Sequence, residues 1–376
     1  MNALDQLIEA GSSLAGSPVT QWKAEGRKVL GFFCAYIPEE LIAAAGALPY
    51  RVRPVGCTQA PLADSMMSSY NCTFARSSLE YALTGKFDFM DGVVSMNSCD
   101  HIRRLYDIWK DKVPAQYMHF MSVPHKASPD GIVWYRNELE KFKLSLEEWL
   151  QAPVEDAQIR KAIQAQNETR GLLRRLYDLR KAPNPPVTGT QVQQILLSAS
   201  AMPKEEYNTL LSAFLDEAAG GPPLSGHKAR LMIIGSMCDS VEFTQLLEKA
   251  GGLVVTDALC FGSRYFWEPV KEEGDDLLTN LADSYLKRPA CARMSDELPK
   301  RMAFVEGLAR EYGVDGIIYE KMRYCDLWAG EGLQLSKLTP EWGIPVLSLD
   351  REYWMSGAAG LRLRIEAFLE NIGKEA

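Results

Sequence analysis

Residues 28–52 read KVLGFFCAYIPEELIAAAGALPYRV, and this stretch decides the fold class. The apolar run KVLGFFCAYI predicts a buried strand. PEELIAAAGA predicts the helix that follows, with Pro38 in its first turn and Gly46 at its end. LPYRV begins a second apolar run and predicts a second strand. Strand, helix and strand in this order form the βαβ unit from which parallel sheets are built.

Strands and helices alternate through the rest of the chain, except in a helical middle. Further strands are predicted at FDFMDGVVSM, QYMHFMSVP, ARLMIIGS, LVVTDAL, DGIIYEK and IPVLSLD. Further helices are predicted at residues 68–84 and at HIRRLYDIWK, VEFTQLLEKAGG, PKRMAFVEGLAREYGV and GAAGLRLRIEAFLENI. Charged segments of helical period, such as YRNELEKFKLSLEEWLQ, fill the middle. We therefore expect an α/β fold with two Rossmann-like parallel-sheet domains and a helical insert.

The expected segments are a helical lead-in at residues 1–25, an N-terminal α/β domain at 26–128, a helical insert at 129–227 and a C-terminal α/β domain at 228–376. A weak internal repeat supports two related halves. DGVVSMNSCDHIRRLYDIW and DGIIYEKMRYCDLWAG share Asp-Gly, a strand, a loop and Cys-Asp. The repeat puts Cys99 and Cys325 at equivalent positions just past a parallel strand, where open α/β sheets hold their functional groups.

Composition narrows the class of protein. The chain has 376 residues, of which 47% are hydrophobic and 24% charged, so large cores are expected and disorder is not. A net charge of -8 without a long Lys/Arg block argues against general nucleic-acid binding. The N-terminus has no signal-peptide pattern, and no apolar run reaches the roughly 18 residues of a membrane helix. We expect a cytoplasmic protein whose eight cysteines are not a disulfide framework.

Several familiar catalytic motifs are missing from the sequence. It contains no G-x-x-x-x-G-K-[ST], no G-x-G-x-x-G, no H-E-x-x-H and no G-x-S-x-G. Nucleotide hydrolysis, a nicotinamide site of the usual kind and hydrolase chemistry therefore have no support. The four histidines, His101, His119, His125 and His227, show no ligand spacing, and each is read as a surface or core residue.

The cysteines divide into two groups. Cys34, Cys57, Cys238, Cys260 and Cys291 lie in or beside apolar segments, where free cysteine behaves as a small hydrophobe. Cys72, Cys99 and Cys325 lie instead in the polar contexts YNCTFAR, NSCDH and RYCDL, with arginines nearby. Basic surroundings and helix starts favour the thiolate that binds iron. Without a C-x-x-C, spacing alone leaves open whether these three are ligands or ordinary cysteines.

Glu39 and Glu40 open the helix after the first strand, and two readings of them are open. They complement the helix dipole as acidic residues of a first turn. Alternatively, Glu40 is a carboxylate at the carboxyl end of a strand, placed for proton transfer.

The motifs taken together resemble the 2-hydroxyacyl-CoA dehydratase / benzoyl-CoA reductase subunit family. The resemblance rests, in order along the chain, on GFFCAYIPEELIAAAGALPYR, DGVVSMNSCDHIRRLYDIW, GSRYFWE with LADSYLKRPACARM, DGIIYEKMRYCDLW and LDREYWMSGAAGLRLRIEAFLE. These segments run from about residue 27 to 370 and so cover nearly the whole chain.

The resemblance implies a site, a cofactor and partners. Cys72, Cys99 and Cys325 match the three cysteines that hold a 4Fe–4S cluster in the cleft between the domains, whereas Cys34 is not an expected ligand. The partners implied are a homologous second subunit (in a heterodimer or a homodimer), an ATP-hydrolysing iron–sulfur activator and an acyl-CoA substrate. In dehydratases of this family the delivered electron makes a ketyl radical on the thioester carbonyl, and in benzoyl-CoA reductases it dearomatises the ring.

Two stretches bear on the substrate. TDALCFGSR is close to the family's D-D-x-C-x-G-S-R-like stretch and keeps Ser263 and Arg264 as candidate pocket residues, although a salt bridge is equally open for Arg264. GAAGLRLR departs from the family's G-Q-x-x-T-R, with Ala359 and Leu363 at the polar positions. Because of that departure, two alternatives stay open: this chain binds its ligand differently from its relatives, or it is the subunit that binds no substrate.

The sequence is therefore compatible with three functions. The first is an iron–sulfur subunit of a radical acyl-CoA enzyme, leaning to benzoyl-CoA-reductase-type ring reduction, with a 2-hydroxyacyl-CoA dehydratase subunit as the alternative. The second is an electron-relay subunit that holds no substrate. The third is a metal-free small-molecule binder of the same architecture.

Overall fold

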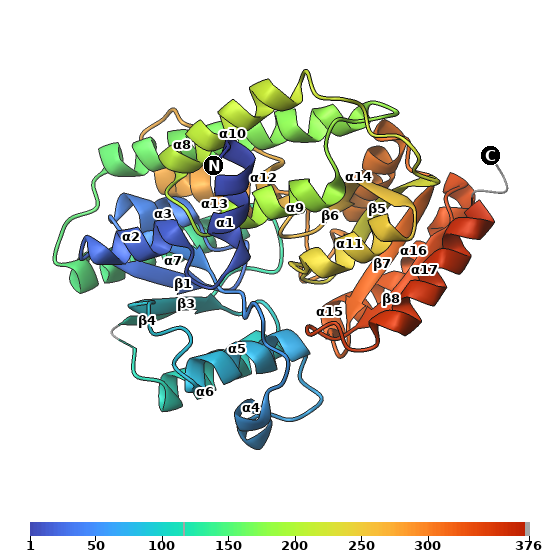
Figure 1. Cartoon of the computed structure of the whole chain (residues 1–376). Coiled ribbons are helices and arrows are strands. Elements are labelled where there is room, and N and C mark those ends of the chain that lie inside the picture. Colours follow the sequence, from blue (N-terminus) through green and yellow to red (C-terminus); the bar gives the residue numbers. More distant parts are fainter. Residues whose placement is uncertain (116, 373–376) are drawn as a thin grey trace.

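The chain forms two four-stranded parallel sheets in the computed structural model, which describes residues 1–115 and 117–372 (Figure 1). The order of the strands is β2-β1-β3-β4 in the first sheet and β6-β5-β7-β8 in the second. The strands are β1 Val29–Phe32, β2 Leu48–Arg51, β3 Gly92–Met96, β4 Tyr117–Met121, β5 Ala229–Gly235, β6 Gly252–Ala258, β7 Gly316–Met322 and β8 Val346–Arg351. All pairs are parallel, which confirms the α/β class and is consistent with two Rossmann-like domains.

The two sheets repeat one topology. In each, the chain runs from the first strand to a neighbour on one side, and then crosses to the other side for the third and fourth strands. The direction of winding therefore reverses between β1 and β3, and again between β5 and β7. Ligands of open α/β sheets bind beyond the carboxyl ends of strands at such switch points. The predicted relation between the halves is confirmed in strand order.

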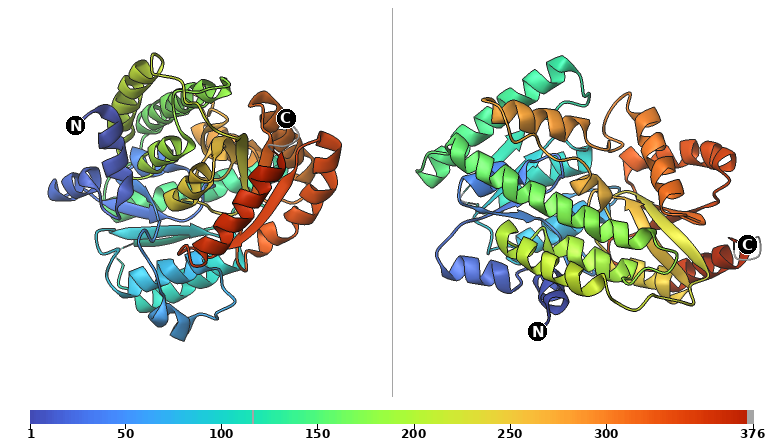
Figure 2. Two further views of the ribbon diagram at one scale, coloured as in Figure 1. Left: turned by 45° about the vertical axis from the view of Figure 1, so that its right-hand side comes forward. Right: turned by 90° about the horizontal axis from the view of Figure 1, so that it is seen from above.

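Helices cover both faces of each sheet (Figures 1 and 2). On the first sheet, α5 and α6 pack on one face while α3 and α7 pack on the other. On the second sheet, α11 and α17 lie opposite α14 and α16. The helices are α1 Ala3–Ser12, α2 Ser17–Ala24, α3 Glu39–Ala44, α4 Pro61–Met66, α5 Thr73–Leu83, α6 Asp100–Lys112, α7 Pro129–Leu150, α8 Asp156–Asp178, α9 Gly189–Ser198, α10 Lys204–Ala218, α11 Val241–Lys249, α12 Ser263–Phe266, α13 Leu277–Lys287, α14 Leu298–Glu311, α15 Asp326–Ala329, α16 Glu331–Trp342 and α17 Ala358–Ile372.

The helices between the sheets join the two halves. Helix α8 buries Ile159 and Ile163 in the core of the first sheet, and Leu173 and Tyr177 in a core of the second sheet. It crosses the molecule over both sheets, as the view from above shows (Figure 2). Since one helix is anchored in two cores, it sets how the two sheets sit relative to each other.

Element ends differ most from the predictions. The predicted strand KVLGFFCAYI ends as a strand at Phe32, and a turn follows in which the Ile37 N–H donates to the Cys34 carbonyl at 3.0 Å. Placing Cys34 within a strand was therefore wrong. The helix predicted at residues 68–84 begins only at Thr73, because residues 68–71 form a turn closed by Asn71 N–H and the Ser68 carbonyl.

The sequence pattern also missed the helices α4, α13 and α16. Residue 116, where the fourth predicted strand was to begin, and residues 373–376 of the predicted C-terminal domain lie outside the described residues. Among the described residues, no helix combines the length and apolar character that crossing a membrane requires.

Candidate functional site

A cavity of about 130 Å³ lies where the carboxyl ends of strands from both sheets meet. Its lining includes residues directly after β1, β3, β5, β6 and β7, so both switch points contribute to it. We call it the cysteine cavity, because six of the eight cysteines line it: Cys34, Cys72, Cys99, Cys260, Cys291 and Cys325. Cys72, Cys99 and Cys325 are called the first trio below.

Each member of the first trio is the N-cap of a helix. Cys72 caps α5, Cys99 caps α6 and Cys325 caps α15. Cys99 follows β3 and Cys325 follows β7, so the two occupy matching places in the two halves, as the repeat predicted. A thiolate at a helix start receives backbone N–H groups and the positive end of the helix dipole. The three positions therefore suit negatively charged sulfur.

Burial opposes that charge while no cation is bound. It raises the pKa of the Cys72 thiol to about 11 and that of Cys99 to about 12, and it raises the pKa of Cys325 further above its usual range. Backbone N–H groups oppose the shift, chiefly that of Ala75 at Cys72 and that of Ile102 at Cys99. A bound cation would replace the thiol protons, as at other thiolate sites.

The imidazole of His101, two residues after Cys99, contacts the segments that contain Cys72 and Cys325. Its Nδ1 lies 2.8 Å from Asn71 Oδ1, and its Nε2 lies 2.7 Å from the Tyr324 carbonyl oxygen. Asn71 directly precedes Cys72, and Tyr324 directly precedes Cys325. Tyr324 has a φ of 67°, a left-handed conformation that costs on the order of 1–3 kcal/mol in a non-glycine residue. His101 thus helps to hold a strained turn beside a candidate ligand.

Replacing His101 with alanine should loosen the first trio, because the contacts of the imidazole with Asn71 and Tyr324 would be lost, at about 0.5–1.5 kcal/mol for each hydrogen bond. If the proposed cluster is present, we expect a chelator to remove iron from His101→Ala several-fold faster than from the wild type under anaerobic conditions. The matched control is His227→Ala, since His227 does not line the cavity. Equal rates for all three proteins would contradict this role.

Three buried arginines line the cysteine cavity as well. Arg51, Arg264 and Arg288 are each less than 10% exposed, and within the described chain none forms an ion pair with a carboxylate. Arg51 Nη2 lies 3.0 Å from Cys260 Sγ, and Arg288 Nη1 donates to the Ala35 carbonyl. The Nε and Nη2 atoms of Arg264 have no hydrogen-bond partner. The salt bridge considered for Arg264 is absent there, and its charge faces the cavity.

Ser263 has a structural place beside this cavity. Its hydroxyl donates to the Asp257 carbonyl at 2.5 Å, and its N–H donates to Asp257 Oδ1 at 2.8 Å. The Tyr177 hydroxyl donates to the same carboxylate. Ser263 is fully buried and does not line the cavity, so its substrate-binding role remains only a prediction.

Gly262 allows this loop to close. A Cβ at Gly262 would overlap the Asp257 carboxylate, so we expect Gly262→Ala to destabilise the fold by about 1–3 kcal/mol through overpacking. Urea unfolding would measure the loss. Gly307→Ala is the control, because a Cβ there meets nothing within 4 Å and alanine favours the helix by roughly 0.5–1 kcal/mol. A Gly262→Ala protein as stable as the wild type would contradict this account of the loop.

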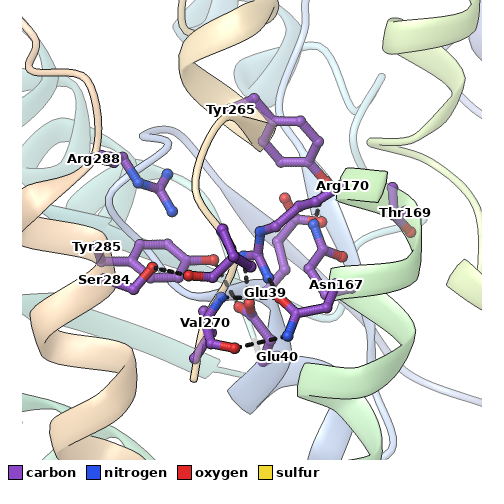
Figure 3. Close-up of polar contacts among 12 residues, drawn as sticks. Glu39, Glu40, Asn167, Thr169, Arg170, Tyr265, Val270, Ser284, Tyr285 and Arg288 are labelled. Carbon is purple, nitrogen blue, oxygen red and sulfur yellow. Dashed lines mark hydrogen bonds and ion pairs between the residues drawn. The ribbon is translucent and has the colours of Figure 1, made fainter. Parts of the chain in front are cut away.

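Glu40 lies outside the cysteine cavity. Its carboxylate accepts from Arg170 Nη2 and from the Tyr285 hydroxyl, both at 2.6 Å, within a buried cluster contributed by α3, α8 and α13 (Figure 3). Burial alone would raise the pKa of Glu40, but the Arg170 charge and the two hydrogen bonds outweigh it and lower that pKa. Glu39 forms a second buried ion pair, with Lys204 at 2.9 Å. The proton-transfer role stays a prediction, and the observed contacts are those of a structural ion pair.

The donor set fits a cluster better than a single ion. Among residues 1–115 and 117–372, no three His, Cys, Asp or Glu side chains are placed to hold one metal ion. A polynuclear cluster has another requirement, because each thiolate binds a different iron and the sulfurs surround the whole group. Cys72 is buried and Cys99 and Cys325 are partly buried, and all three lie at helix starts near guanidiniums that pair with no carboxylate among the described residues. This donor set is compatible with an anionic iron–sulfur group.

The family model and the relatives similar in sequence point to one family. A family model described as "2-hydroxyglutaryl-CoA dehydratase, D-component" matches residues 34–372. A benzoyl-CoA reductase subunit from Thauera aromatica is 28% identical over 87% of this chain and 87% of its own length. The beta subunit of (R)-2-hydroxyglutaryl-CoA dehydratase from Acidaminococcus fermentans is 27% identical over 98% of this chain and 100% of its own. The putative dehydratase subunit YjiM of Escherichia coli is 25% identical over 94% and 93%.

Proposed function

This chain belongs to the 2-hydroxyglutaryl-CoA dehydratase, D-component family, and from that membership we propose that it is the iron–sulfur subunit of a radical acyl-CoA enzyme. In the proposal, Cys72, Cys99 and Cys325 hold one 4Fe–4S cluster in the cysteine cavity between the two sheets. The observation that carries it is the convergence of these three N-cap cysteines, from segments far apart in the sequence, on one cavity.

The chain's own residues would serve the cluster in three ways. When bound, a 4Fe–4S cluster supplies single-electron transfer. The helix starts at α5 and α6 direct N–H groups at its thiolates, which stabilises negative charge. Phe33, Phe74 and Trp328 line the cavity and limit the access of water. Arg264 lines it as well, and its positive charge lowers the pKa of the Cys291 thiol.

Partners follow from the same proposal. The named relatives are subunits of larger enzymes, which supports a homologous second subunit beside this one. The sequence has no phosphate-binding loop, which supports a separate ATP-dependent iron–sulfur activator as the electron donor. An acyl-CoA thioester is the proposed substrate of the complete enzyme.

For the reaction we favour benzoyl-CoA-type ring reduction, with 2-hydroxyacyl-CoA dehydration as the alternative. Similarity to the benzoyl-CoA reductase of Thauera aromatica supports the first, and similarity to dehydratase beta subunits supports the second. Anaerobic assays of the complete complex with benzoyl-CoA and with several 2-hydroxyacyl-CoAs would separate them. Ring reduction is expected, and turnover of the hydroxyacyl substrates alone would contradict this preference.

The size of the cavity favours a second candidate, an electron-relay subunit whose partner holds the substrate. About 130 Å³ is below the ≈ 300–1,000 Å³ of common small-molecule pockets. Electron paramagnetic resonance of the isolated subunit, with and without acyl-CoA, would decide between the two. A spectrum that acyl-CoA alters would support substrate binding here, whereas an unchanged spectrum would support the relay.

A further inference from the structure

Three more cysteines share the cavity of the first trio. Cys34, Cys260 and Cys291, called the second trio below, were read from sequence as small core hydrophobes, but all three line the cysteine cavity. Cysteines that serve only as hydrophobes would be scattered through the five apolar cores that the described residues form. Of the eight, Cys57 and Cys238 alone lie away from this cavity. The gathering of six thiols is therefore a feature that packing does not explain.

The two trios adjoin one another. Cys34 lies close enough to Cys99 and to Cys291 to interact electrostatically with both. Cys291 interacts in the same way with Cys325. Five of the six sulfurs thus form one continuous group, and Cys260, which follows β6, lines the same cavity.

The backbone of the second trio is anchored while its thiols face the cavity. Arg51 Nη1 donates to the Cys260 carbonyl at 2.5 Å, and Arg301 Nη1 donates to the Cys291 carbonyl at 3.1 Å. The Cys291 N–H lies 3.3 Å from the Tyr36 hydroxyl oxygen. Such anchoring is what a metal centre needs, because ligands must be held close to their bound geometry.

The buried positive charge is a second and independent indication of an anionic ligand. Arg51, Arg264 and Arg288 surround the second trio, and buried nitrogen atoms of each lack a hydrogen-bond partner. An uncompensated buried charge costs several kcal/mol, so a compensating anion is expected in the cavity. An iron–sulfur group with thiolate ligands is such an anion, and its potential depends on hydrogen bonds to its sulfurs.

We propose that Cys34, Cys260 and Cys291 bind a second iron–sulfur unit, beside the one assigned to the first trio. Soft thiolate ligands without imidazole or carboxylate select iron–sulfur clusters, zinc or copper(I), and the neighbouring cluster makes iron and sulfide the consistent choice. The inference deepens the proposed function and rests on it. A subunit with two centres would accept more than one electron before its substrate reacts.

Metal content tests this without reliance on activity. The full chain would be isolated without oxygen, and its iron and acid-labile sulfide would be measured per chain. We expect about eight irons in the wild type, and about four in the triple variant Cys34→Ala, Cys260→Ala, Cys291→Ala. A wild type with about four irons, unchanged in the triple variant, would overturn the second centre and leave the proposed function standing.

Two further variants complete the design. Cys57→Ala with Cys238→Ala removes the cysteines outside the cavity, and we expect wild-type iron content. The first-trio variant, Cys72→Ala with Cys99→Ala and Cys325→Ala, should keep iron on the second trio. Circular dichroism on each protein reports whether it is folded. A wild type that binds no iron would count against the proposed function itself, and so is distinguishable from failure of the second centre alone.

Discussion

Cys325→Ala is expected to abolish the activity of the complete enzyme while leaving the subunit folded. In the proposed cluster, Cys325 is the one first-trio ligand that comes from the second sheet, so its loss would leave the cluster held from the first sheet alone. Cys325 packs at the edge of two apolar cores, where alanine keeps part of the contact. The hydrogen bond from the Cys325 N–H to the Met322 carbonyl at 2.9 Å does not involve the thiol and should survive the substitution. Anaerobic turnover with the reconstituted activator and partner would measure the effect.

Cys238→Ala is the matched control for that substitution. Cys238 also follows a strand of the second sheet, but it lies in an apolar core and does not line the cavity. We expect this variant to retain activity, with a modest loss of stability from the smaller side chain. Activity of Cys325→Ala close to that of Cys238→Ala would show that the first trio is not the electron-carrying site.

Arg170→Met is expected to destabilise the chain by about 3–5 kcal/mol, the largest single effect on folding that we anticipate. Arg170 and Glu40 are almost fully buried, and Arg170 Nη2 lies 2.6 Å from Glu40 Oε1. Removing the guanidinium therefore leaves the Glu40 carboxylate buried without its charged partner. Urea unfolding would measure the loss. Arg175→Met on the same helix is the control, because its pair with Asp216 is exposed and a change of at most about 0.5 kcal/mol is expected.

The ion pair also predicts a pH dependence. The pKa of Glu40 is lowered in the folded chain, so its contribution to stability is present above the unfolded value of 4.5 and is lost as the pH falls through the folded pKa. The difference in unfolding free energy between the wild type and Glu40→Gln should therefore be full at neutral pH and shrink below about pH 4.5. A difference that stays constant down to pH 3 would contradict the assigned cause.

Much of the fold could be predicted from the sequence, because local patterns determine it. Apolar runs separated by helical periods identified all eight strands, and the repeated Asp-Gly, strand, loop and Cys-Asp pattern identified Cys99 and Cys325 as equivalent positions. The ends of strands were harder to predict from the sequence. The apolar run that contains β1 continues through Cys34 to Ile37, although the strand ends at Phe32.

The missed features depend on contacts between distant segments. His101 meets Tyr324 across 223 positions, and Glu40 meets Arg170 across 130. Cys291 lies between α13 and α14 without any local motif, and only folding brings it to the cavity that Cys34 and Cys260 also line. No periodicity or spacing in the chain carries this information, so the second trio emerged only from the three-dimensional arrangement.

The central claim, that the first trio binds a 4Fe–4S cluster, is tested most directly by electron paramagnetic resonance of the reduced chain isolated without oxygen. We predict the signal of a reduced 4Fe–4S cluster in the wild type. When Cys72, Cys99 and Cys325 are all replaced by alanine, we predict loss of the part of that signal that belongs to the first trio, so that only the signal of the second unit remains. A wild type with no such signal and no iron, or a signal that survives unchanged in the triple variant, would contradict the account.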